Sequence, residues 1–347
     1  MRVGVRYDSL SERIGAAFNQ VPVPLGLSMF GMPVARSLQA AQRLGVFAAL
    51  AEGPASAGEL CSRLALTERG SRLLLDALCA TGVVRTAAGE RYELEPDARK
   101  WLDPASPSYV GDFLADTHHY WAWWDGLEAL LHDGVSIELH DKAADDPYWD
   151  SYIAGQYQLA RLSSASVAKA VALPAGARSL LDVAGGHGEF AMALCRRHAE
   201  LRATVVELAG SARVGRRIVA QAGMAERVSF LEGDMFAAAL GGAHDGALCF
   251  NIVHHLSPER AQALFAKVGE ALAPGAPICV LDLYDRPPGR RPDSASFLGL
   301  FFALTSGAGT YTVAEVSRWL AEAGFGPAKA RRLAALPGLV LLRAERL

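Results

Sequence analysis

The stretch LLDVAGGHGEF, residues 180–190, decides the fold of this chain. Its apolar run ends on Asp182, and three glycines and a histidine follow. Small residues between a strand and a helix let the backbone pass close to a ligand at the helix N-terminus. Gly186, Gly188 and Ala191 also fit the G-x-G-x-x-A pattern of nucleotide-binding turns. The stretch therefore predicts a strand, a nucleotide-binding turn and a helix, but by itself it does not select the nucleotide.

The chain that surrounds this stretch alternates apolar runs with amphipathic segments. Predicted strands cover 179–184, 203–207, 228–233, 246–252, 277–284, 329–336 and 338–345. Predicted helices cover 188–199, 211–222, 258–272 and 313–323. This alternation predicts an α/β fold with a parallel, doubly wound, Rossmann-like sheet. Only LPG, residues 336–338, joins the last two strands, which is too short for a crossover helix, so we expect that pair to be antiparallel.

Acidic residues at the ends of three successive predicted strands indicate the charge of the ligand. Asp182 precedes the glycine turn, where a carboxylate repels a pyrophosphate and attracts an amine. Glu207 ends the next strand, where an acid can bind two ribose hydroxyls, and Asp234 follows the third, where it can accept a hydrogen bond from an adenine amine. A cationic adenosine cofactor, S-adenosylmethionine (SAM), fits these acids. The other residues that we assign to its site are Ala184, Gly185, Gly186, Gly188, Met235 and Asn251.

The composition narrows the class of protein. A length of 347 residues suggests about two domains, and 51% apolar with 20% charged residues is typical of a globular protein. The net charge of −3 argues against a nucleic-acid partner, and no apolar run approaches the ~18 residues of a membrane helix. The five cysteines are isolated, without metal-ligand spacing, and the first residues lack the apolar run of a secretion signal. We therefore expect a cytoplasmic protein with reduced cysteines, no metal and no membrane partner.

The N-terminal part has a different pattern from the rest. Residues 33–82 have helical periodicity, and Ser56 with Glu59 matches a capping box. VVRTAAGERYELE, residues 83–95, predicts two short strands, so that three short helices and a hairpin form a winged helix. The predicted domains are a winged-helix domain over 1–107, a helical, aromatic linker over 108–170 that contributes to the substrate pocket, and a SAM-binding catalytic domain over 171–347.

Several stretches, in order, resemble the SAM-dependent O-methyltransferases of plant caffeate type and their bacterial natural-product relatives. Those that resemble the family's winged-helix dimerisation domain are LGVFAALAEGPASAGEL (44–60) and RYELEPDARKWL (91–102). Those that resemble its catalytic core are LLDVAGGHGEF, EGDMF (232–236), NIVHHLSPE (251–259) and AEVSRWLAEAGF (314–325). The resemblance implies methyl transfer from SAM to a hydroxyl of an aromatic small molecule in bacterial secondary metabolism. It also implies a homodimer formed through the N-terminal domain.

The resemblance also implies which residues act on the acceptor. His254 falls on the position of the family's catalytic base, and Asp282, in VLDLYD, falls on the position of the acid that orients the imidazole. A phenol has a pKa near ~10 and a free histidine near ~6.5, so proton removal must be concerted with attack on the methyl group or helped by the acid. Alignment of the reacting atoms supplies most of the acceleration, because effective molarities can reach ~10⁵ M or more.

Three positions depart from the family's usual pattern. Phe250 stands where a lysine is common, and His255 stands where the family has aspartate. GAGTYT, residues 307–312, replaces GGKERT, so Thr310 occupies the place of a second catalytic glutamate. The base and its first partner are therefore present, whereas the second partner is replaced.

We place the acceptor pocket between the helical linker and the segment after the fifth strand. By motif position, its residues are Tyr152, Gln156, Phe297, Phe301 and Thr305. Large aromatic side chains with few charges predict a flat, largely apolar acceptor such as a polyketide phenol. Trp121, Trp123 and Trp124 are interpreted as core or dimer packing.

Other functions remain open at this point. A winged helix often binds DNA, although TERGSRLLLDALCATG, residues 67–82, offers only Arg69 and Arg72. A dehydrogenase that uses NAD(P) would share the glycine turn, but Asp182 and the antiparallel C-terminal pair argue against it. A member of the family could also methylate nitrogen or carbon, or use SAM for chemistry other than methylation.

Overall fold

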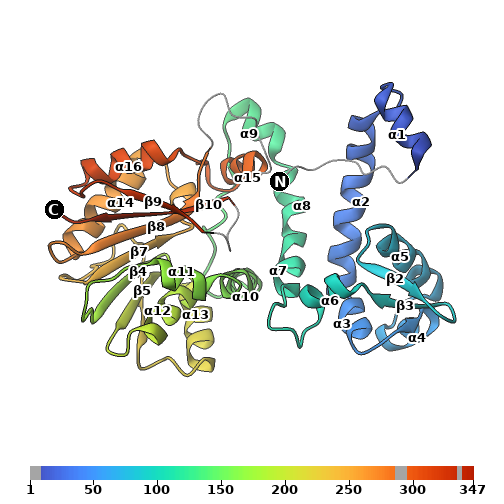
Figure 1. Ribbon diagram of the computed structural model, residues 1–347, viewed down its shortest axis with the longest axis horizontal. Coiled ribbons are helices and arrows are strands. Elements are labelled where there is room, and N and C mark those ends of the chain that lie inside the picture. Colours follow the sequence, from blue (N-terminus) through green and yellow to red (C-terminus); the bar gives the residue numbers. More distant parts are fainter. Residues whose placement is uncertain (1–8, 286–294, 334–337) are drawn as a thin grey trace. The chain divides into compact units, whose positions relative to one another are not determined.

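In the computed structural model, residues 9–285, 295–333 and 338–347 are described. The chain divides into two units, Met1–His118 and His119–Leu347 (Figure 1). The first unit is helical with a small sheet, and the second unit contains the large sheet.

The sheet of the second unit has seven strands in the order β6-β5-β4-β7-β8-β10-β9. The strands are β4 (Ser179–Val183), β5 (Arg202–Glu207), β6 (Val228–Glu232), β7 (Gly246–Phe250), β8 (Pro277–Leu283), β9 (Lys329–Arg332) and β10 (Leu339–Glu345). The strands β4 to β8 pair in parallel, and β10 pairs antiparallel with both β8 and β9. The predicted doubly wound sheet with an antiparallel C-terminal pair is thus confirmed. Residues 334–336 of the strand predicted over 329–336, and most of the LPG segment, lie outside the described residues.

Four helices connect the strands at the positions that the sequence pattern predicts. They are α12 (Glu189–Arg197), α13 (Ala209–Gln221), α14 (Pro258–Ala271) and α16 (Val313–Glu322). Side-chain caps fix two of their starts: Ser257 Oγ accepts from the Arg260 amide, and Thr312 forms a capping box with Glu315. A further helix, α15 (Ala295–Ser306), was not predicted. Its sequence, ASFLGLFFALTS, is apolar on every side and has no helical period to detect.

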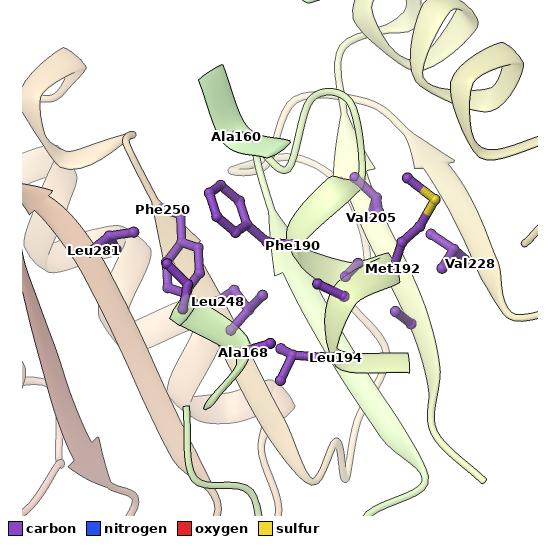
Figure 2. Packing of buried hydrophobic residues seen from close by; sticks show 14 of the residues in the cluster. Ala160, Ala168, Phe190, Met192, Leu194, Val205, Val228, Leu248, Phe250 and Leu281 are labelled. Atoms are coloured by element: carbon purple, nitrogen blue, oxygen red, sulfur yellow. The ribbon is translucent and has the colours of Figure 1, made fainter. Parts of the chain in front are cut away.

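Helices cover both faces of the sheet. On one face, Phe190 and Met192 of α12 are buried against Val205 of β5 and against Leu248 and Phe250 of β7 (Figure 2). On the other face, the alternate β7 residues, Ala247 and Cys249, belong to a second cluster with α14 and α16. Because successive strand residues point to opposite faces, β7 and β8 are buried throughout.

The prediction that residues 108–170 are helical is wrong for the middle of this segment. Its helices are α7 (Gly111–Asp116), α8 (Tyr120–Trp124), α9 (Leu127–Asp133), α10 (Tyr148–Arg161) and α11 (Ser164–Ala170). Residues 134–147 are irregular, because Gly134 ends α9 in a left-handed conformation (φ 69°) and Pro147 caps the start of α10. The irregular segment is tied to α15, since the amides of Ile137 and Leu139 donate to the carbonyls of Leu304 (2.7 Å) and Thr305 (3.2 Å).

The first unit has the winged-helix arrangement. Its main helices are α2 (Val23–Arg43), α3 (Val46–Ala51), α4 (Ala57–Leu64), α5 (Glu68–Ala80) and α6 (Pro96–Leu102). The hairpin of β2 (Val84–Ala87) and β3 (Arg91–Leu94) gains a short third strand, β1 (Ala55–Ser56), which the sequence did not predict. The capping box of Ser56 and Glu59 is present. A short α1 (Leu10–Ala17) precedes α2, which begins before the predicted residue 33 and contains Pro33.

Two general features follow from the described residues. None of their helices combines the length and the hydropathy that are needed to cross a membrane. All five cysteines are free.

Candidate active site

A histidine and an aspartate meet at the carboxyl ends of β7 and β8. His254 lies in a short 3-10 turn, η2 (Val253–His255), and its Nδ1 lies 2.6 Å from Oδ1 of Asp282. The amides of Val253 (3.0 Å) and His254 (3.3 Å) donate to Oδ2 of Asp282, and the Leu283 amide donates to Oδ1 (2.7 Å). Both side chains are buried. A carboxylate that accepts these bonds keeps the proton of His254 on Nδ1, which leaves the lone pair of Nε2 available as a base.

The ring of Phe302, from α15, stacks on the imidazole of His254. The ring centroids are 3.7 Å apart and the planes differ by 19°. Thr310, at the position of the family's second glutamate, donates its hydroxyl to Oδ1 of Asp285 (2.5 Å). The imidazole thus has an aromatic ring on one face, and the position of the second glutamate holds no carboxylate.

The glycine turn after β4 has a backbone that few side chains tolerate. Ala184, Gly186 and Gly188 all have positive φ values (55°, 52° and 71°). A Cβ at Gly185 would lie 2.5 Å from the carboxyl group of Asp182, so this position also requires glycine. The Gly186 amide donates to Oε2 of Glu207 (2.8 Å), which joins the turn to the end of β5.

Asp182 lies beneath this turn and is only 1% exposed. Its Oδ2 is buried and has no hydrogen-bond partner among the described residues. Burial, and then the charge of Glu207, raise the pKa of Asp182 to about 8. Burial also raises the pKa of Glu207. Two neighbouring acids whose negative charges repel each other, one of them with an unpaired oxygen, fit a positively charged ligand and disfavour a pyrophosphate.

The remaining predicted cofactor residues lie at the same edge of the sheet, because parallel strands end there together. Asp234 is exposed, and its Oδ1 accepts from the Phe236 amide (2.6 Å). Met235 is half-buried, and Asn251 is exposed with a positive φ of 53° directly after β7. His187 has a structural contact, since its Nδ1 accepts from the Glu189 amide (3.0 Å) at the start of α12. Burial lowers the pKa of His187 to about 4.

The predicted acceptor residues lie on two helices. Tyr152 and Gln156 are half-buried on α10. On α15, Phe297 is 59% exposed, and Phe301 packs against the rings of Tyr120, Trp123 and Trp124 of α8 at centroid distances of 4.8, 6.0 and 6.1 Å. Thr305 is fully buried, and its hydroxyl donates to the Phe301 carbonyl (2.8 Å), so that hydroxyl is already engaged within the helix.

Sequence reasoning missed His140, which lies in the irregular segment 134–147. Its Nε2 is 3.3 Å from the Tyr152 hydroxyl, and its ring contacts His255 edge-on at 4.8 Å. His255 in turn lies 4.3 Å from His254, ring to ring, and its Nδ1 is buried without a hydrogen-bond partner among the described residues. Burial lowers the pKa of His140 to about 4 and that of His255 well below its usual range, so both rings are neutral at neutral pH. The irregular segment that carries His140 has no helical or strand periodicity, so the sequence pattern gave no signal that this histidine belongs to the site.

These side chains do not form a metal site. Among the residues that the structure describes, no group of three or more His, Cys, Asp or Glu side chains is arranged to hold a metal ion.

Comparison with known protein families gives two matches, which together cover most of the chain. Residues 132–326 match the O-methyltransferase domain, and residues 28–104 match the O-methyltransferase dimerisation domain.

Two curated relatives come from species of Streptomyces. The tetracenomycin polyketide synthesis 8-O-methyl transferase of Streptomyces glaucescens is 34% identical over 302 residues, which cover 84% of this chain and 87% of the relative. The 3-hydroxy-5-methyl-1-naphthoate 3-O-methyltransferase of Streptomyces sahachiroi is 29% identical over 318 residues, which cover 89% of this chain and 90% of the relative.

A solved structure has the same fold. The crystal structure of human N-acetylserotonin methyltransferase in complex with SAM aligns with a TM-score of 0.83 at 19% identity and covers 99% of each chain.

Proposed function

This chain belongs to the SAM-dependent O-methyltransferase family, and we propose that it methylates a hydroxyl group of an aromatic small molecule with His254 as the base. SAM is its cofactor and S-adenosylhomocysteine its product. The observation that carries the proposal is the 2.6 Å contact of His254 with Asp282, which leaves Nε2 free to accept a proton.

The cofactor would be held at the carboxyl edge of β4, β5, β6 and β7. The buried, unpaired oxygen of Asp182 lies beneath the glycine turn and the carboxyl group of Glu207 beside it, and both acids would carry negative charge opposite a bound cation. Asp234, Met235 and Asn251 extend the site along that edge. Bound there, SAM supplies a methyl group that is electrophilic because its sulfur is positively charged.

The protein's own part in the reaction is to align the acceptor and remove its proton. Nε2 of His254 accepts the proton of the acceptor hydroxyl, and the histidine then carries a positive charge. Asp282 stabilises that charge through Nδ1 and keeps the ring in one tautomer. The backbone amides of Val253, His254 and Leu283 hold Asp282 in place, so the pair does not reorganise during proton transfer.

An aromatic acceptor is supported by the side chains near the base. Phe301 joins the α8 aromatic residues Tyr120, Trp123 and Trp124 in one cluster, which offers flat apolar surface. His140 and His255 are polar but neutral, so they suit an acceptor with oxygen substituents and no net positive charge. The names of the two relatives refer to tetracenomycin polyketide synthesis and to a hydroxynaphthoate, which supports a phenol from bacterial natural-product biosynthesis as the acceptor.

We further propose that the enzyme is a cytoplasmic homodimer. Its match to the dimerisation domain supports a dimer, as does the apolar surface of α1 and α2, where Phe18, Met29, Phe30 and Met32 are each more than half exposed. The free cysteines agree with a reducing compartment.

The test is a mass-spectrometric screen for methyl transfer. The enzyme and SAM are incubated with phenols, catechols, hydroxyquinones and nitrogen heterocycles, with a His254→Ala variant in parallel. A product that is heavier by one methylene, forms on oxygen and is lost in the variant supports the proposal. A product methylated on nitrogen or carbon favours the alternative acceptors. If S-adenosylhomocysteine binds but no acceptor in the panel reacts, non-methylating chemistry becomes the better hypothesis.

A further inference from the structure

We propose that Phe302 is a positioning residue for His254: its ring holds the plane of the imidazole while Asp282 holds Nδ1. The proposal rests on the proposed role of His254 as the base. Two contacts in different directions are needed, because the bond to Asp282 fixes one ring nitrogen but still allows the ring to swing about that bond. A face-to-face neighbour prevents the swing and keeps Nε2 directed at one place.

The contact geometry supports this role. The centroid distance of 3.7 Å with planes 19° apart is a close, nearly parallel contact over the face of the imidazole. The adjacent residue Phe301 points elsewhere, into the aromatic cluster with Tyr120 of α8 at 4.8 Å. Consecutive residues of one helix point in different directions, so α15 presents one phenylalanine to the cluster and the other to the base.

The α15 backbone that carries Phe302 is itself held in place. The hydroxyl of Ser306 donates to the Phe302 carbonyl (2.8 Å), and that of Thr305 donates to the Phe301 carbonyl (2.8 Å). The irregular segment donates two amides to the same end of α15, and Leu304 and Thr305 are fully buried there. Because α15 is anchored in this way, the Phe302 ring has little freedom to move together with the imidazole of His254 and can therefore restrain it.

Phe302 also explains how the base functions without a second carboxylate. Thr310, which replaces that carboxylate, bonds to Asp285 through its hydroxyl. A second carboxylate would fix the imidazole and also attract its positive charge. A phenylalanine ring restrains the orientation of the imidazole and adds no formal charge, so Asp282 remains the one anionic partner on the described part of the chain.

The experiment compares Phe302→Leu with Phe302→Tyr, and uses Leu298→Ala as the control from the same helix, at a side chain that is 45% exposed. With the best acceptor from the screen, Phe302→Leu is expected to lower kcat by ~10-fold or more and to leave KM nearly unchanged, because a misplaced base slows the chemical step. Phe302→Tyr keeps the stacked face and is expected to restore kcat. Leu298→Ala is expected to leave both kcat and KM nearly unchanged.

A spectroscopic measurement tests the same contact without turnover. In NMR spectra of the enzyme with S-adenosylhomocysteine, the ring current of Phe302 should shield the carbon-bound ring protons of His254. The Phe302→Leu variant should shift them downfield, whereas Leu298→Ala and Phe302→Tyr should leave them nearly in place. Unmoved His254 resonances, or an unchanged kcat in Phe302→Leu, would overturn the proposal. A wild-type enzyme that shows the ring-current effect but methylates no hydroxyl would instead count against the proposed function.

Discussion

His254 Nδ1 lies 2.6 Å from Asp282 Oδ1, across two neighbouring strands of the sheet. The parallel register places Phe250 of β7 opposite Leu281 of β8, and the Asn251 amide donates to the Leu281 carbonyl (2.8 Å). Asp282 is therefore the first residue beyond that pairing, level with the turn that carries His254. The register of the sheet, and not a flexible loop, brings acid and base together, which makes the pair a fixed part of the fold.

Replacing His254 by alanine should separate catalysis from cofactor binding. We expect turnover to fall by ~10²-fold or more because the variant loses the side chain that we propose as the base for the hydroxyl proton. The affinity for SAM, measured by calorimetry, should be nearly unchanged. His132→Ala, at an exposed histidine of α9, is the control and should retain activity. An equal loss of binding and turnover in His254→Ala would show that the residue is structural.

The Asp282→Asn variant should be nearly as damaging to turnover, although its side chain has almost the same shape. An asparagine amide has no charge to stabilise the protonated histidine and can favour the wrong tautomer, so we expect a loss of ~10²-fold or more in kcat. Because Val253 and His254 donate their amides to this carboxylate, the variant should also unfold at a lower temperature. Wild-type kcat in Asp282→Asn would exclude the orienting role.

Glu207→Ala should weaken SAM binding by ~10-fold, since the carboxylate that we propose as the ligand of the ribose hydroxyls would be lost, together with its bond to the Gly186 amide. The matched control is Glu232→Ala, because Glu232 pairs with Glu207 in the register of β5 and β6 but is exposed and bonded to Arg216. Isothermal calorimetry should show the loss in the first variant alone. Similar affinities in both variants would refute the ribose-binding role.

Cofactor binding should release a proton near neutral pH. In the absence of ligand the pKa of Asp182 is about 8, above the usual ~3.9, so the carboxyl is largely neutral at pH 7. A bound cation favours the charged carboxylate, and SAM affinity should therefore rise as the pH increases from about 5 to about 8. Calorimetry in buffers of different ionisation enthalpy measures the released proton. Asp182→Asn should remove the release; if it persists there, another group is responsible.

The same raised pKa predicts how the stability of the free protein depends on pH. The neutral form of Asp182 is the one that folding favours, so its contribution is fully present below the unfolded pKa of ~3.9. It is lost as the pH rises toward about 8. In thermal unfolding without ligand, the difference between wild type and Asp182→Asn should change over this window; a constant difference would contradict the assignment.

The apolar surface of the N-terminal helices should mediate dimerisation. Phe30, on α2, is 65% exposed, and a Phe30→Glu change should shift the protein toward monomer in sedimentation velocity, because an unpaired charge would be buried at the interface. Leu73 has a similar exposure of 61% but is on α5, outside the run of exposed apolar residues on α1 and α2, so Leu73→Glu should remain a dimer. A monomeric wild type would exclude the dimer altogether.

The irregular segment and α15 show where sequence reasoning failed. α15 is apolar on all sides, so no period separates a buried face from an exposed one. His140 lies in a segment that was expected to be helical and that takes its place through two bonds to α15. The two hydrogen bonds between the irregular segment and α15 cannot be anticipated from local pattern, because each joins residues that are more than a hundred positions apart in the chain.

The sequence by itself determined the alternation of strands and helices, the glycine turn, the three acids at strand ends, and the positions of His254 and Asp282. These features are local: hydrophobic period, turn chemistry and motif spacing are written in consecutive residues. Only the tertiary structure decided that Asp182 is buried beneath Gly185, that Phe302 covers the imidazole and that Thr310 turns to Asp285. Burial and side-chain contacts depend on which segments pack together, and packing is a property of the whole folded chain.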